Sequence, residues 1–148
     1  MPRVPVHDLD SAPKASRDLL AALKERYGKV LNIYGEMAHA PVVLAAYTGI
    51  QAAIAEHGSF DARTREAIAA RFGLPIDAKL DALLAVARQA ATRVGEVDEA
   101  TWQQARDAGW RVGELAELFA YLIANMFTNY FNHYVGTELD FPPAPDPA

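Results

Sequence analysis

Side chains that could do acid–base chemistry gather near the C-terminal end of this sequence. His133 lies among Asn129, Tyr130, Asn132 and Tyr134, so an imidazole is surrounded by aromatic and amide groups. A histidine in this setting could act as a base or contact a ligand, because its ordinary pKa lies near neutrality. The alternative is that these residues form hydrogen bonds across a helix end or at a contact between subunits.

The other histidines are too scattered to predict a metal site. His39 precedes Ala-Pro and is expected to stabilise a turn, while His57 precedes a glycine at an expected helix C-terminus, where a cation is favourable. No His-x3-His unit occurs. Asp8 and Asp10, beside His7, lie in an expected flexible arm. We therefore predict no metal and no cofactor.

The 148 residues include no cysteine. This excludes a cysteine nucleophile, a disulfide scaffold and a thiolate metal site within the chain. The net charge of −5, without a basic stripe, argues against binding to nucleic acid. No apolar stretch is long enough to span a bilayer, and the N-terminal residues lack the apolar region of a secretory signal. We expect a cytoplasmic protein without membrane contact.

The spacing of apolar residues predicts an all-α protein, because β-branched residues do not alternate and alanine is abundant. We expect an extended N-terminal arm over 1–12, a single helical domain over 13–141 and a flexible proline-rich tail over 142–148. The stretch 30–38 is expected to add one or two turns. About six helices are predicted, over residues 13–28, 40–58, 59–73, 77–94, 98–109 and 113–134.

Polar residues just before these segments are candidate helix caps. Ser11 could cap the first helix, Ser59 or Asp61 the third, and Asp98 the fifth. The last segment is the most aromatic. Its aromatic stripe could line a cofactor pocket, although packing in a core or an interface is the ordinary use of such residues. The stripe consists of Phe119, Tyr121, Phe127, Tyr130 and Phe131.

Short motifs in order along the chain resemble those of the carboxymuconolactone decarboxylase / alkylhydroperoxidase D family. Met37–Pro41 resembles the family's Ala-His-x-Pro turn, and Phe60–Glu66 resembles its Leu-Asp-x-Arg-x-Arg-Glu motif. Thr137–Pro142 resembles the end of its C-terminal tail. The likeness spans most of residues 3–142. It implies an alkylhydroperoxidase D-like helical bundle, homo-oligomers formed through helical faces, and reduction of hydroperoxides or action on a small acidic or lactone substrate.

The same resemblance assigns a catalytic role to Glu66, which matches the family's proton-relay carboxylate. The alternative is that Glu66 faces solvent in the first turns of a helix, where the helix dipole favours a negative charge. In the thiol-dependent branch this Glu begins the pattern E-x11-C-x-x-C-x3-H, and counting from Glu66 places Ala78, Asp81 and Ala85 at the reactive positions. None carries a thiol or an imidazole. The branch without cysteines uses a histidine in this region, which this chain also lacks.

The sequence therefore resembles the family but lacks the residues on which the family's usual chemistry depends. After Ala70 the sequence continues through Arg71 directly into a segment that resembles the family's next helix. This suggests that the reactive helix is missing and that the chain is shortened relative to the family. Three interpretations stay open. The chain could be an enzyme of the family, with Glu66 and His133 as catalytic candidates. It could be a non-catalytic helical oligomer or a small-ligand-binding protein. It could also be a shortened form of an active enzyme.

Overall fold

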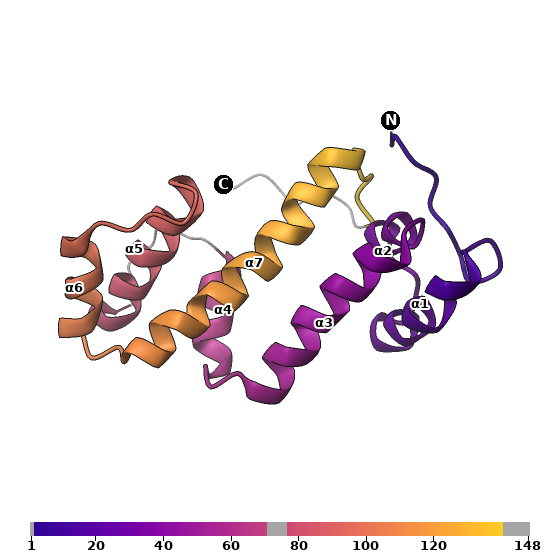
Figure 1. The fold of residues 1–148 in the computed structure, drawn as a ribbon. Coiled ribbons are helices and arrows are strands. Elements are labelled where there is room, and N and C mark those ends of the chain that lie inside the picture. Colours follow the sequence, from indigo (N-terminus) through magenta and orange to yellow (C-terminus); the bar gives the residue numbers. More distant parts are fainter. Residues whose placement is uncertain (1, 71–76, 141–148) are drawn as a thin grey trace, which may run out of the picture. The chain divides into compact units, whose positions relative to one another are not determined.

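A computed structural model describes residues 2–70 and 77–140, and within them it is all-helical, as predicted (Figure 1). Seven helices occur in these residues where about six were expected, since the short stretch over 30–38 forms a helix of its own. The helices are α1 (Lys14–Tyr27), α2 (Asn32–Met37), α3 (Pro41–His57), α4 (Ala62–Ala70), α5 (Ala78–Thr92), α6 (Glu99–Asp107) and α7 (Val112–Val135). No helix in the described residues is long and apolar enough to cross a membrane.

The chain divides into two compact units. Unit 1 comprises Met1–Ile50 and Phe127–Ala148, and unit 2 comprises Gln51–Met126. The helices α3 and α7 each contribute to both units, whereas α1 and α2 belong to unit 1 and α4, α5 and α6 to unit 2. The expected arm, domain and tail boundaries stay predictions. The tail over 142–148 lies outside the described residues, as does Arg71 at the suspected junction.

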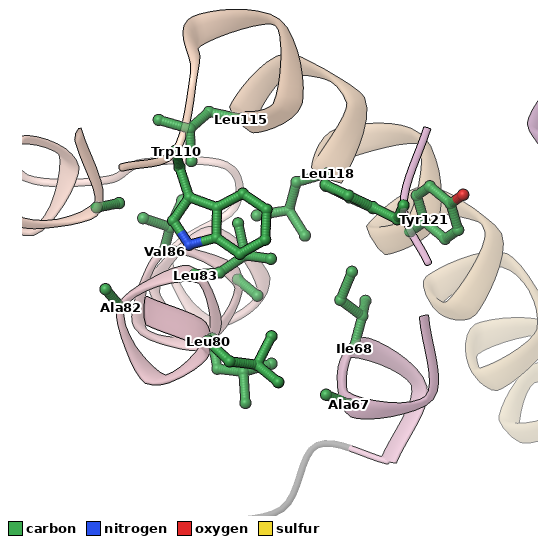
Figure 2. Close-up of a cluster of buried hydrophobic side chains, with 14 residues drawn as sticks. Ala67, Ile68, Leu80, Ala82, Leu83, Val86, Trp110, Leu115, Leu118 and Tyr121 are labelled. Carbon is green, nitrogen blue, oxygen red and sulfur yellow. The ribbon is translucent and has the colours of Figure 1, made fainter. Parts of the chain in front are cut away.

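Unit 2 is built around side chains from α4, α5 and α7 that converge on one apolar cluster (Figure 2). Leu83 from α5 is fully buried, and Leu118 from α7 is nearly so. Trp110 closes the cluster, with its indole Nε1 donating a hydrogen bond to the carbonyl of Lys79 at 2.7 Å. Phe60 packs edge-on against the Trp110 ring, with ring centroids 5.7 Å apart. Burial of these faces explains why the helical stripes in the sequence are apolar.

Unit 1 has its own core, formed by α1, α2 and the first part of α3 together with Phe127 and Phe131 of α7. The N-terminal residues attach to it through backbone hydrogen bonds, from Arg3 to the Val135 carbonyl and from His7 to the Gly35 carbonyl at 3.2 Å. A Cβ at Gly35 would lie 2.5 Å from the His7 carbonyl oxygen. The close approach of these two segments therefore requires glycine at this position.

Three aspartates cap helices, and two of them were predicted to do so. The Asp98 carboxylate accepts the amide of Thr101 at 2.8 Å at the start of α6, and Asp61 accepts the amide of Thr64 at 2.7 Å before α4. Asp77 caps α5 in the same way. The expectation for Ser11 is wrong. Its hydroxyl donates to Asp8 at 2.7 Å, and α1 begins after Pro13 without a side-chain cap.

The cap of α6 predicts a specific dependence of stability on pH. Hydrogen bonds from the amide and hydroxyl of Thr101, and then from Gln89, lower the pKa of Asp98 to about 2. Because the unfolded chain binds this proton more readily, the stabilisation is complete above the ordinary value of 3.8 and is lost as the pH falls toward 2. Asn is also a good N-cap. The stability difference between wild type and Asp98→Asn should therefore shrink from pH 5 to pH 2 in thermal melts. A difference that stays constant would contradict this assignment.

Candidate functional site

A cavity of about 200 Å³ lies within unit 2, between α4, α5 and α7. Its lining combines aliphatic side chains, which form most of the surface, with three polar ones. The lining residues are Ile68 of α4, Leu84, Ala87, Arg88, Ala91 and Thr92 of α5, and Leu122 and Asn125 of α7. The volume is below the usual range for drug-sized ligands, so the space suits a small molecule. An apolar cavity of roughly 150 Å³ in another protein accommodates benzene.

The sequence of α5 explains why space is left at this place. The five lining residues of this helix follow one another at the spacing of a single helical face. At the middle of this face stand Ala87 and Ala91, whose methyl side chains occupy less space than a leucine or isoleucine would. Ile68 and Leu122 stand across the space on α4 and α7. The face is therefore apolar at Leu84 and both alanines, and polar at Arg88 and Thr92.

Hydrogen bonds to the backbone hold two of the polar lining groups. The Thr92 hydroxyl donates to the carbonyl of Arg88 at 2.8 Å. The side-chain Nδ2 of Asn125 donates to the backbone carbonyl of Tyr121 at 3.0 Å. These contacts orient the Thr92 and Asn125 side chains at the cavity, so these two polar groups of the lining have defined positions.

Arg88 differs in its partners from Arg63 and Arg93, two other arginines of unit 2. Arg63 pairs with Asp77 at 3.1 Å, and Arg93 pairs with Asp98 at 3.3 Å. In the part of the chain that the structure describes, no carboxylate and no hydrogen-bond acceptor contacts the Arg88 guanidinium. Its donors can therefore contact solvent or a ligand at the cavity.

A second polar group of unit 2 is Glu117 on α7, which the sequence did not single out. Its carboxylate accepts the Ser59 amide at 2.7 Å, the Ser59 hydroxyl at 2.5 Å and the Phe60 amide at 3.2 Å. It thereby holds the turn between α3 and α4. Ser59, predicted as a possible helix cap, binds this glutamate, and Asp61 caps the helix.

The hydroxyl of Tyr121 lies close to this turn. It is buried without a hydrogen-bond partner among the described residues, and it points away from the apolar cluster (Figure 2). Burial, and then the negative charge of Glu117, raise the pKa of Tyr121 above its ordinary value. The group is therefore a neutral phenol at pH 7, available as a donor and unsuited to act as a base.

The two predicted catalytic residues do not line the cavity. Glu66 is exposed on α4 in unit 2, and His133 is exposed in the last turn of α7 in unit 1. The structure therefore does not assign them to one site, and their roles stay predictions. Of the aromatic stripe, Tyr121 is in the unit 2 core, whereas Phe119 and Tyr130 are more than half exposed. Phe127 and Phe131 pack against the unit 1 core.

Unit 1 contains a histidine pair that sequence reasoning missed. The Nε2 of His7 lies 3.2 Å from the Nδ1 of His39, and the Nε2 of His39 lies 2.8 Å from the Pro5 carbonyl oxygen. Because a carbonyl only accepts, His39 donates from Nε2, and the neutral form of the ring accepts at Nδ1. Burial, and then His39, lower the pKa of His7. The pair joins the N-terminal segment to the turn before α3. This contact agrees with the expectation that His39 stabilises a turn.

Glu36 and His39 share Glu-x-x-His spacing, which can provide two metal ligands on a helix, but here their side chains have separate partners. Glu36 is 1% exposed and binds the hydroxyl of Thr137, whereas His39 is exposed and contacts His7. Among residues 2–70 and 77–140, no group of three potential ligands could hold a metal ion.

No profile of a known protein family matches this chain, and no curated protein matches it. Solved structures do. A protein from Ralstonia eutropha JMP134, described as an alkylhydroperoxidase AhpD core and an uncharacterized peroxidase-related protein, superposes with a TM-score of 0.77 at 19% identity. The match covers 94% of this chain and 92% of that one. The chain has the AhpD-core fold. An uncharacterized peroxidase-related protein from Silicibacter sp. TM1040 matches with a TM-score of 0.71 at 17% identity, over 94% of each chain.

These matches bear out the sequence resemblance at the level of fold. They also bear on the suspected deletion, because they extend over nearly the whole length of both neighbours. A likeness of this extent gives no sign that a whole helix has been removed relative to these two proteins. The absence of cysteine is independent of this comparison, because proteins that share a fold can differ in the residues that carry out chemistry.

Proposed function

We propose that this protein binds a small, largely apolar molecule in the unit 2 cavity and has no thiol peroxidase activity. The cavity itself carries the proposal, because it combines aliphatic walls from three helices with a few polar groups at defined positions. This combination is typical of small-molecule sites. The AhpD-core fold supplies the helical framework for the site, and a fold alone does not decide the activity.

The residues at the positions that match the thiol-dependent pattern argue against peroxidase activity. Ala78 and Asp81 lie in the first turn of α5, and Ala85 lies one turn further on. A thiolate nucleophile is what attacks a peroxide in such a mechanism, and the chain contains no cysteine. In the thiol-dependent mechanism Glu66 would relay protons to a thiol, and this chain has no thiol.

Incubation with a hydroperoxide and a dithiol reductant provides the test of this part of the proposal. We expect the purified chain to consume hydroperoxide at the rate of buffer alone, because no side chain can form the required sulfenic acid. The same assay on the Glu66→Gln variant provides the control. Consumption above buffer that falls in Glu66→Gln would overturn the proposal and favour a family enzyme that acts without cysteine.

A second role, that of a homo-oligomer, has support from the surface of α7. Phe119 is 58% exposed in unit 2, and Tyr130 and Tyr134 are 60% and 73% exposed in unit 1. Large exposed apolar side chains are frequent at interfaces between subunits. We propose that the protein assembles with copies of itself in the cytoplasm, without membrane or nucleic-acid partners. Light scattering of the purified chain should give a mass at least twice the 16.1 kDa of one chain, and a strictly monomeric mass would contradict this.

A further inference from the structure

We propose that the ligand of the unit 2 cavity is a small monocarboxylic acid whose acidic group pairs with Arg88 and whose hydrocarbon part fills the space among Ile68, Leu84 and Leu122. This inference rests on the proposed function, since it names the ligand class of the same site. It follows from three features of the cavity, namely its charge, its walls and its size.

The charge at the cavity is positive and has no counterpart in the described residues. Arg88 lines the space, and no described carboxylate lies within ion-pair distance of it. None of the other lining residues is charged. A planar guanidinium presents paired donors that fit a carboxylate in a bidentate arrangement. An anionic head group is therefore the complement of this part of the lining.

The remaining lining selects the rest of the ligand. Ile68, Leu84 and Leu122, with the two alanines of α5, provide hydrocarbon surface, which favours an alkyl or aryl group over a sugar or a phosphate ester. A volume of about 200 Å³ is little larger than a cavity that accommodates benzene, so the ligand should have on the order of ten non-hydrogen atoms. Short fatty acids and phenyl-substituted acids fit both requirements.

Matched probes separate this inference from the proposed function. Hexanoate and hexanamide have the same carbon chain, and only the first is an anion at pH 7. Titration of the full-length chain, followed by NMR of backbone and methyl groups at low salt, should shift signals of Ile68, Leu84 and Leu122 with both probes. Because Arg88 is exposed, the acid should bind only about fivefold more tightly than the amide.

Variants assign this preference to Arg88. In Arg88→Gln the affinity for hexanoate should fall to that for hexanamide, while Arg88→Lys should retain part of the difference, since it keeps the charge but loses the bidentate fork. Lys24→Gln removes an exposed charge from α1 in unit 1 and should leave the preference unchanged. Equal affinities for the two probes in wild type, or a preference that survives in Arg88→Gln, would overturn the inference and leave the proposed function standing. If neither probe shifts the cavity signals, the proposed function fails as well.

Discussion

Replacing Leu83 with alanine should lower the free energy of unfolding by about 3 kcal/mol. Leu83 is fully buried at the centre of the unit 2 cluster, where it packs with side chains of α4 and α7 (Figure 2). The cost combines lost burial of methyl groups with the empty space that a rigid core cannot close. Urea denaturation would measure it directly, and for a chain of this size the midpoint of thermal unfolding should fall by roughly 6–12 °C.

Val112→Ala is the control for this prediction. Val112 is 59% exposed at the start of α7, so its truncation should change the free energy of unfolding by no more than about 0.5 kcal/mol. Similar losses in the two variants would mean that Leu83 is not the packing centre that the structure assigns.

Replacing Ala91 with tryptophan should strongly weaken ligand binding while the protein stays folded. Ala91 lines the cavity from α5 and is half-buried, so an indole at this position can occupy the space left by the short side chain. Small molecules that bind in the cavity should then bind at least about tenfold more weakly, because the indole occupies the space that they would fill. NMR titration with hexanamide measures the loss, and the circular dichroism spectrum should remain helical.

Ala100→Trp provides a matched substitution at an exposed position of α6. It adds the same indole to unit 2 outside the cavity and should leave the affinity for hexanamide within about twofold of wild type. Undiminished binding in Ala91→Trp would show that the probes bind elsewhere on the protein.

Much of the fold follows from local signals in the sequence. The segment over 77–94 was predicted from an apolar face that ends at a glycine, and α5 occupies Ala78–Thr92 of it. Asp98 was predicted as a cap because an aspartate precedes an expected helix, and its carboxylate does accept the Thr101 amide. Such features depend on neighbours within a few residues, which a sequence displays directly.

Features that depend on distant partners were missed or misassigned. Ser11 resembles a helix cap, but Asp8 competes for its hydroxyl, and the chain turns before α1 begins. Glu117 looks like an ordinary helical glutamate, although its carboxylate holds the turn at Ser59 from 58 residues away. Competition among possible partners is decided by packing, which the spacing of residues does not reveal.

The candidate site illustrates the same limit. Ala87 and Ala91 lie on one face of α5, and the spacing of residues in the sequence does not reveal the cavity beside them. Whether small residues make a tight contact or leave a cavity depends on the distance to α4 and α7. Arg88 attracted no attention in the sequence, because an arginine on a helix is ordinarily a solvated charge. Its lack of a partner becomes visible only once its neighbours are in place.

Nuclear Overhauser contacts between hexanamide and the methyl groups of the protein test the central claim most directly. We predict contacts from the alkyl chain of the probe to Ile68, Leu84 and Leu122, which line the cavity on three different helices, and none to the exposed Val112. Saturating probe without contacts to the three cavity residues, or with contacts only to exposed methyl groups, would show that the unit 2 cavity is not a ligand site.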